Sequence, residues 1–432
     1  MREIAPRSVV LSGIELASQV AAPVADDVID NLELSLEDVG DFPHSQYSSS
    51  QIARAGKLIA SDLEIANDQV PLDVRDAFLV ANNWRDAHAY PMRSIRQSLQ
   101  YHVKANDLDA LTAARLKRMQ AIRRKLRRID MPLHKLQDLG GCRVILATIA
   151  ETRALVSILK DKLPSVVIKE SDYISKPKSD GYRSHHLVFK FSRPKKITPF
   201  DGKRIEVQVR THLQHSWATA VETVGLFRGE ELKNQKGDKD WLRFFALMSA
   251  EFAEAEKCAT VPGTPDSDAR KLEIAELEKS LDALAVLERI AIGFQGTDLP
   301  LTPGYKPSHF LIKFEHSTKT VHVQPYNRAT NATASYDRAE EIQRAGDPND
   351  AVVLVEVDKI NDLKKAYPNY FGDVDLFRRQ LAQIVRGGAA IEYKRPPRER
   401  QKKRPVESRG DISWLRGTRF PKPNTSKKKK RR

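Results

Sequence analysis

The 432-residue sequence has two cysteines, four tryptophans and no apolar stretch long enough to cross a bilayer. Because Cys142 and Cys258 are far apart, the sequence predicts neither a disulfide framework nor a zinc site, and it fits the reducing environment of the cytoplasm. A membrane-spanning helix needs about 20 mostly apolar residues. Glu15 interrupts the N-terminal apolar stretch, so we interpret that stretch as an extension and not a signal peptide. These absences predict a cytoplasmic protein that does not enter membranes.

Positive charge is abundant but unevenly distributed along the chain. The formal net charge is +15, yet residues 394–432 alone hold 17 Lys and Arg against three Asp and Glu. The preceding 393 residues hold 55 basic and 54 acidic residues and are close to neutral. A tail this charged and rich in proline does not form a core. Two readings stay open: an arm that binds RNA or another polyanion by releasing counterions, or a solvated tail that keeps the protein soluble.

Patterns of helix and strand alternate between residues 135 and 227, which predicts an α/β domain around a small mixed sheet flanked by helices. A hairpin, a helix and a further strand are expected between 301 and 390, as a second small α+β unit. The heptad-like spacing of residues 271–292 is compatible with a homo-oligomer, although a core-facing helix explains it better. The expected divisions are an N-terminal extension (1–45), a main domain with N-terminal helices (46–260), a linker and long helix (261–300), an accessory domain (301–390) and a basic disordered tail (391–432).

The segment "RIEVQVRT" has the alternation of a strand with one buried face. Successive side chains of a strand point to opposite faces. Glu206, Gln208 and Arg210 therefore share one face, and Val207 and Val209 share the other. Taken alone, this strand is better explained as the exposed face of an ordinary antiparallel sheet.

A second carboxylate gives that strand a different meaning. Asp138 lies just before the double glycine that opens the apolar strand in "LQDLGGCRVIL". Asp138 and Glu206 at one sheet could hold Mg²⁺, which prefers one or two carboxylates and leaves its other positions to water and phosphate. Basic side chains near both acids fit the charge neutralisation that phosphoryl transfer requires. They precede the acids or lie between them, at Arg115, Lys117, Lys125, Lys176 and Lys178.

The stretch "SKPKSDGYRSHHLVFKF" combines lysines, a turn and an aromatic ring before a strand. Gly181 permits a positive φ or a close approach to a ligand. We expect Tyr182 to present its ring outward, where a purine could stack. Lys178 would then meet the phosphates of that nucleotide, and His186 would reach its phosphate or sugar. An ordinary hairpin turn explains the stretch if it is considered alone.

Three segments in this order, "DLGGCRVI", "DYISKPKSDGYRSHHLV" and "IEVQVRTHLQHSWATAVE", resemble the RelA/SpoT nucleotidyltransferases, the alarmone synthetases. The resemblance covers about residues 50–260 and is densest between 115 and 222. It implies a nucleotidyltransferase-like fold and an ATP-dependent pyrophosphokinase. Such an enzyme transfers the β,γ-pyrophosphate of ATP to the 3′-hydroxyl of GDP or GTP and makes ppGpp or pppGpp.

The resemblance also implies roles for individual residues. Asp138 would be the Mg²⁺ ligand, Glu206 a second acid that helps the metal or activates the acceptor hydroxyl, and Tyr182 the guanine-stacking residue. "RLKRMQAIRRKL" is similar to the ATP-binding stretch of the family. The other matched positions have implied contacts to ATP, to phosphates or to the acceptor: Arg115, Lys117, Lys125, Arg143, Lys178, His186, Gln208 and Arg210.

Departures from the family pattern leave the acceptor open. Ala121 replaces a serine of the ATP-binding stretch, and Asp180 replaces the asparagine that commonly precedes Gly-Tyr. No His-Asp dipeptide lies upstream, so we expect a synthetase without a hydrolase domain. The alternatives are toxin-type pyrophosphorylation of the tRNA 3′ end, synthesis of adenosine alarmones, and a non-catalytic module that binds nucleotide or RNA.

Overall fold

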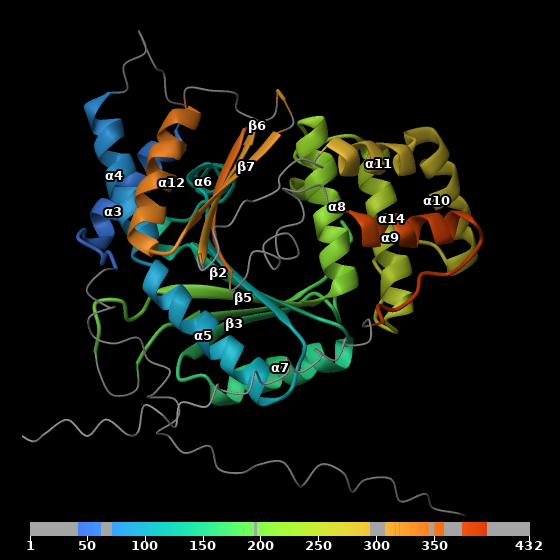
Figure 1. Cartoon of the computed structure of the whole chain (residues 1–432), viewed down its shortest axis with the longest axis horizontal. Helices are drawn as coiled ribbons and strands as arrows, with labels where there is room; N and C mark the ends of the chain where they lie inside the picture. The colour runs from blue at the N-terminus through green and yellow to red at the C-terminus, as the bar shows by residue number, and fades with distance from the viewer. Residues whose placement is uncertain are drawn as a thin grey trace, which may run out of the picture. The chain divides into compact units, whose positions relative to one another are not determined.

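The computed structural model describes residues 42–61, 71–193, 197–293, 307–315, 317–318, 320–344, 350–357 and 374–394. The expected N-terminal extension and almost all of the basic tail lie outside these residues. The described elements up to Tyr393 belong to one compact unit (Figure 1). Among them, no helix is long and apolar enough to span a bilayer.

An eight-stranded mixed sheet runs through the described part of the chain, in the order β3-β4-β5-β2-β1-β8-β6-β7. Strands β2 and β5 are parallel neighbours, and the other paired strands are antiparallel. This confirms the expected mixed α/β class. The strands are β1 (Leu111–Leu116), β2 (Gly140–Leu146), β3 (Val166–Asp172), β4 (His185–Lys190), β5 (Arg204–Thr211), β6 (His309–Glu315), β7 (Thr320–Tyr326) and β8 (Ala351–Glu356).

Helices cover both faces of the sheet (Figure 1). One face packs against α5 and α7, and α8, α9 and α14 share a second core with the apolar residues of β6 and β8. The helices are α3 (Ser49–Ala60), α4 (Leu72–Asp86), α5 (Ala89–Ala105), α6 (Met119–Arg128), α7 (Ile149–Lys162), α8 (His212–Arg228), α9 (Lys239–Ala255), α10 (Ser267–Leu281), α11 (Ala283–Gly293), α12 (Ala329–Arg344) and α14 (Asp375–Val385), with 3₁₀ turns η1 (Leu133–Lys135) and η2 (Leu232–Asn234).

Residues at the two ends of α8, the helix that follows β5, determine where this helix begins and ends. Thr211 and Gln214 form a capping box at its first turn, in which the side chain of each residue accepts a hydrogen bond from the backbone N–H of the other. Gly229 ends the helix with a φ of +71°, a conformation that glycine adopts without steric cost. The strand β5 therefore passes directly into a helix.

The segment expected as an accessory domain extends the main sheet. Its hairpin β6–β7 and strand β8 form as the sequence predicts, and Ala114 of β1 pairs with Glu356 of β8. The strand β1 itself was not predicted, because its sequence "LTAARL" alternates weakly. The division into a main and an accessory domain stays a prediction.

The single long helix expected within 261–300 is wrong, because the chain breaks at Asp282. Asp282 adopts a φ of 51° and separates α10 from α11. A short polar side chain tolerates this left-handed conformation better than most. Ile274, Leu287 and Ile290 are buried in the core, so these apolar positions of the segment face the protein interior, whereas Leu272 is exposed.

Candidate active site

The polar face of β5 lies beside the start of β2. The parallel register pairs Gly141 with Glu206 and Arg143 with Gln208. Residues paired in this way point to the same side of a sheet. On the opposite side, Val207 is fully buried in the core beneath α5 and α7. The alternation expected from the sequence is therefore confirmed.

Two lysines hold the carboxylate of Asp138, which lies two residues before β2. Asp138 Oδ2 accepts hydrogen bonds from Lys117 Nζ at 2.9 Å and from Lys125 Nζ at 2.8 Å. Burial alone would raise the pKa of Asp138, but the two ammonium groups outweigh it and hold the pKa at about 2. Burial lowers the pKa of Lys117, an effect that Asp138 opposes. At neutral pH Asp138 is therefore a carboxylate.

The other oxygen of Asp138 is available to a further ligand. Oδ1 is buried and has no hydrogen-bond partner among the described residues. Burial and the charge of Asp138 act to raise the pKa of Glu206, but hydrogen bonds from His186 and Gln208 and the charge of His186 outweigh them and lower it. The effect of Asp138 means that the two carboxylates lie within electrostatic reach of each other. The described residues contain no cluster of three or more His, Cys, Asp or Glu side chains that could bind a metal. Two carboxylates with one free, buried oxygen fit Mg²⁺ that completes its shell with phosphate and water.

A hydrogen-bonded chain links Glu206 to Tyr182. His186 Nδ1 lies 3.1 Å from Glu206 Oε1, and its Nε2 lies 2.8 Å from the Tyr182 hydroxyl. Because the carboxylate can only accept, Nδ1 donates to Glu206, and a neutral ring then accepts from Tyr182. Gln208 Nε2 donates to the second oxygen of Glu206 at 2.8 Å. These donors fix the orientation of the carboxylate.

Tyr182 is half-buried, which corrects the expectation of an exposed ring. It packs edge-on against Tyr173 and Trp217, with ring centroids 5.9 and 6.4 Å away. Burial raises the pKa of its hydroxyl to about 12. Lys178 Nζ lies 4.7 Å from the ring centroid of Tyr173 and 5.3 Å from that of Tyr182, within cation–π range. The aromatic cluster and the lysine therefore form one continuous surface.

The turn before Tyr182 packs against the helices α8 and α9. Gly181 has a φ of +91°, as the sequence predicts. A Cβ at this position would lie 2.9 Å from Trp217 Cζ2 and 3.0 Å from Ser249 Cβ, so the close approach is to the helices α8 and α9 and not to a ligand. Asp180 Oδ1 accepts from the Tyr182 backbone at 2.8 Å, and its Oδ2 accepts from Gln235 at 3.2 Å. Asp180 thus has a structural role in the turn.

The acid Glu222 belongs to the same charged surface, although a solvated helix face is enough to explain it from the sequence alone. It pairs with Lys233. Burial opposes ionisation of Glu222, but Lys233, Arg143 and Arg115 outweigh it and hold its pKa well below the usual range. Its position as the last acid of "IEVQVRTHLQHSWATAVE" was the signal that could have identified it.

The predicted site residues form two hydrogen-bonded groups, and the others lie around these groups. Asp138 gathers Lys117 and Lys125, and Glu206 gathers His186 and Gln208. The remaining residues lie around these two groups: Arg115 and Arg143 within reach of the Glu222 charge, Arg210 within reach of Tyr182, Lys178 on the tyrosines, and Lys176 exposed on the same loop.

A family model described as "Region found in RelA / SpoT proteins" matches residues 114–226. The chain is 28% identical over 134 residues to the GTP pyrophosphokinase YjbM of Bacillus subtilis (strain 168), covering 30% of this chain and 61% of that protein. It is 32% identical over 136 residues to the GTP pyrophosphokinase YwaC of the same strain, covering 30% and 63%. The chain thus spans about three fifths of the length of these relatives. The crystal structure of small alarmone synthetase 1 from Bacillus subtilis bound to pppGpp aligns at 26% identity with a TM-score of 0.28, over 34% of this chain and 77% of that chain.

Proposed function

We propose that this protein, whose residues 114–226 match the family model of RelA/SpoT proteins, transfers the β,γ-pyrophosphate of ATP to the 3′-hydroxyl of GDP or GTP. The observation that carries the proposal is the placement of two carboxylates within electrostatic reach of each other, Glu206 on β5 and Asp138 just before the neighbouring strand β2, where two lysines hold it. The names of the relatives YjbM and YwaC point to the same reaction class.

The lysines beside Asp138 are suited to ATP. In the structure Lys117 and Lys125 neutralise Asp138, and both lysine side chains are partly exposed. Triphosphate entering this site would draw the two lysines onto its oxygens, since a phosphate carries more negative charge than a carboxylate. Arg115 and Arg143, which act on Glu222 from the adjoining surface, would extend the phosphate or adenine contacts.

Asp138 and Glu206 would hold Mg²⁺, which supplies charge neutralisation for the phosphates when bound. The free Oδ1 of Asp138 provides the first protein ligand. Glu206 is the second acid, and the donors His186 and Gln208 orient its two oxygens. No further protein ligand is needed, because Mg²⁺ keeps several positions for water and phosphate.

The acceptor nucleotide would lie over the aromatic cluster. Tyr182 offers one ring to the base, and Lys178 would leave the rings for the acceptor phosphates, because an anion attracts it more strongly than a ring quadrupole. The 3′-oxygen attacks the β-phosphorus, the bond from that phosphorus to the bridging oxygen of the α-phosphate breaks, and AMP leaves with the electron pair. The proton of the 3′-hydroxyl passes to the Glu206 carboxylate, which is ionised at neutral pH since its pKa lies below the usual value.

A second acceptor class is the 3′-terminal hydroxyl of an RNA. The exposed side chains Lys176 and Lys178 and the excess of 14 positive charges in residues 394–432 favour it. The chemistry at Asp138 and Glu206 would be the same, and only the molecule that carries the hydroxyl would differ.

The test is product analysis with ATP labelled in its γ-phosphate, with Mg²⁺ and, separately, GDP, GTP, AMP and tRNA. We expect AMP and one labelled acceptor, and a rate about 10²–10³-fold lower for Asp138→Asn, because the site loses a charged group aimed at the reacting phosphates. Asp130→Asn is the matched control, since Asp130 is exposed and outside the site. The proposal would be contradicted if no label passed from ATP to any of the four acceptors, or if the Asp138→Asn variant were as active as the wild type.

A further inference from the structure

The helix that carries Lys125 has no N-terminal cap of its own. Helix α6 begins at Met119 after Arg118, whose side chain makes no capping hydrogen bond. Its first turn contains no acidic residue. The first backbone N–H groups of a helix have no partner within the helix, and they form a partial positive charge that an anion stabilises. The local sequence "RMQAIRRKLRR" therefore leaves the start of α6 without an acceptor or a compensating charge.

Glu340, from helix α12, supplies what α6 does not contain. Its Oε1 accepts from the Met119 backbone N–H at 2.8 Å and also from the Tyr336 hydroxyl. Its Oε2 accepts from Arg85 Nη1 at 2.9 Å. Glu340 is 5% exposed, so little water competes for these bonds. A carboxylate 221 residues further along the chain thus caps the N-terminus of α6.

The position of α6 determines where the phosphate-binding lysines lie. Lys125 is on α6, and Lys117 lies two residues before the first residue of this helix, Met119. Both ammonium groups donate to Asp138 Oδ2. Arg123 and Arg127 tie the outer side of the helix to the carbonyls of Ile59 and Ala60. At the first turn the side chains of Met119 and Ile122 pack in a hydrophobic core, and Glu340 supplies the polar contact of the backbone there. A shift at this turn would move the two lysines relative to Asp138.

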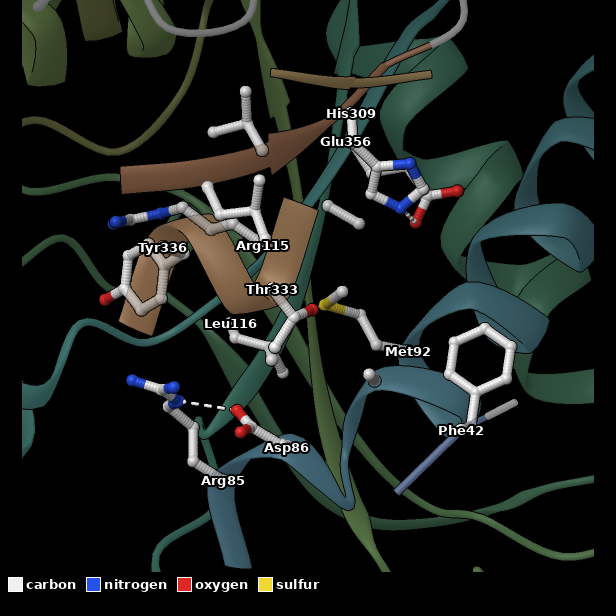
Figure 2. A pocket seen from close by; sticks show the side chains of 14 residues that line it. Phe42, Arg85, Asp86, Met92, Arg115, Leu116, His309, Thr333, Tyr336 and Glu356 are labelled. Atoms are coloured by element: carbon white, nitrogen blue, oxygen red, sulfur yellow. Dashed lines mark hydrogen bonds and ion pairs between the residues drawn. The ribbon is translucent and has the colours of Figure 1, made fainter. Parts of the chain in front are cut away.

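A second buried carboxylate of the same segment provides a comparison. Glu356 of β8 lies 3.1 Å from Arg96 and 3.8 Å from Arg93, both on α5. It joins the segment to α5, and among the described residues it makes no hydrogen bond or ion pair to α6. A pocket lies between this segment and the elements α4, α5 and β1. Figure 2 shows Glu356 with His309 on one side of the pocket, and Arg85, Asp86 and Tyr336 on the other. Neither Asp138 nor Glu206 lines this pocket.

We infer that Glu340 is a positioning residue for the ATP-binding lysines, acting through the N-terminus of α6. The inference rests on the proposed function only in naming ATP as the ligand of Lys117 and Lys125. It gives the segment expected as an accessory domain a defined task at the synthetase site: it fixes the helix that the synthetase sequence cannot cap itself.

The experiment compares Glu340→Ala with Glu356→Ala in the full-length protein, because each removes a buried carboxylate from arginine partners. We expect Glu340→Ala to raise the KM for ATP on the order of tenfold, because a charge at a partly buried helix end has an effect of about this size. The KM for the acceptor should stay unchanged. Glu340→Gln keeps an acceptor for Met119 and should recover part of the affinity. Glu356→Ala should leave both KM values unchanged.

Hydrogen–deuterium exchange of residues 119–128 is the second readout and needs no enzymatic activity. It should be about tenfold faster in Glu340→Ala and unaltered in Glu356→Ala. Equal effects of the two variants on exchange and on the KM for ATP would overturn the inference, as would wild-type values in Glu340→Ala. If either alanine variant does not fold, the Gln variants at both positions make the same comparison. A wild-type protein inactive with every acceptor would refute the proposed function, and exchange alone would then decide on Glu340.

Discussion

The two acids of the candidate site have different surroundings. Asp138 lies between two ammonium groups, which hold its pKa at about 2. Glu206 instead has a histidine and an amide as donors, which lower its pKa against the opposing effects of burial and of the Asp138 charge. Asp138 is thus the more strongly ionised of the two and suits a permanent ligand of a cation. Glu206 is the acid better suited to accept a proton.

Gly181 combines a backbone requirement with a packing requirement. Any side chain at its φ of +91° is strained, and a Cβ would also meet Trp217 and Ser249 at about 3 Å. Gly263 provides a separation of the two effects, since its φ is +77° and nothing lies within 4 Å of a Cβ placed there.

We expect Gly181→Ala to lower the free energy of unfolding by about 2–4 kcal/mol, from backbone strain and overpacking together. Gly263→Ala should lower it by only about 1 kcal/mol, from backbone strain alone. Urea denaturation monitored by circular dichroism measures both. Equal losses in the two variants would mean that the contact with α8 and α9 adds nothing.

A buried carboxylate at the end of α9 joins three other parts of the site scaffold. Glu256 forms an ion pair with Arg183 at 2.8 Å, in the residues just before β4. It also accepts from Gln214 at 3.1 Å and from Thr211, both in the capping box of α8. Since Arg183 directly follows Tyr182, this cluster connects the aromatic ring of the site to the start of α8.

Glu256→Ala should cost about 3–5 kcal/mol of unfolding free energy, because Arg183 is left charged and buried without its partner. Replacing both residues, Arg183→Met with Glu256→Leu, should recover most of this loss. The Arg243–Glu273 pair, which also involves α9, is about one third exposed and serves as the control. Glu273→Ala should cost less than about 1 kcal/mol.

Chemical denaturation of these three variants and the wild type forms the measurement. A Glu256→Ala variant that is destabilised no more than Glu273→Ala would contradict the assigned role of Glu256. So would a double variant less stable than Glu256→Ala itself.

The charge of the whole chain is concentrated outside the compact unit. The net charge of +15 falls to +1 without residues 394–432, and the compact unit ends at Tyr393. Folding of the sheet and helices should therefore be independent of the tail, whereas attraction for polyanions should depend on it.

Deletion of residues 394–432 should leave the thermal unfolding midpoint and pyrophosphate transfer to a nucleotide acceptor unchanged. Affinity for a generic single-stranded RNA should fall at least about tenfold near 0.1 M salt, and the salt dependence of binding should flatten, because fewer counterions are released. Fluorescence anisotropy over a salt series provides the measurement. Equal RNA affinity with and without the tail would favour the reading of a solvated, solubilising segment.

Sequence periodicity and local turn chemistry determined much of the site by themselves. The alternation in "RIEVQVRT" assigned Glu206 and Gln208 to one face, since the two-residue period of a strand is a local property. The hairpin β6–β7 and the positive φ of Gly181 were likewise predictable from neighbouring residues. The family resemblance then identified which polar residues belong together.

Only the tertiary structure decided how distant segments meet. The parallel pairing of β2 with β5 brings Glu206 beside Gly141, and α12 brings Glu340 onto the start of α6. Tyr182 is half-buried because α8 packs against it through Trp217. The break between α10 and α11 depends on the left-handed conformation of a single residue, Asp282. Such contacts join residues tens to hundreds of positions apart, and their energies depend on packing that no local pattern records.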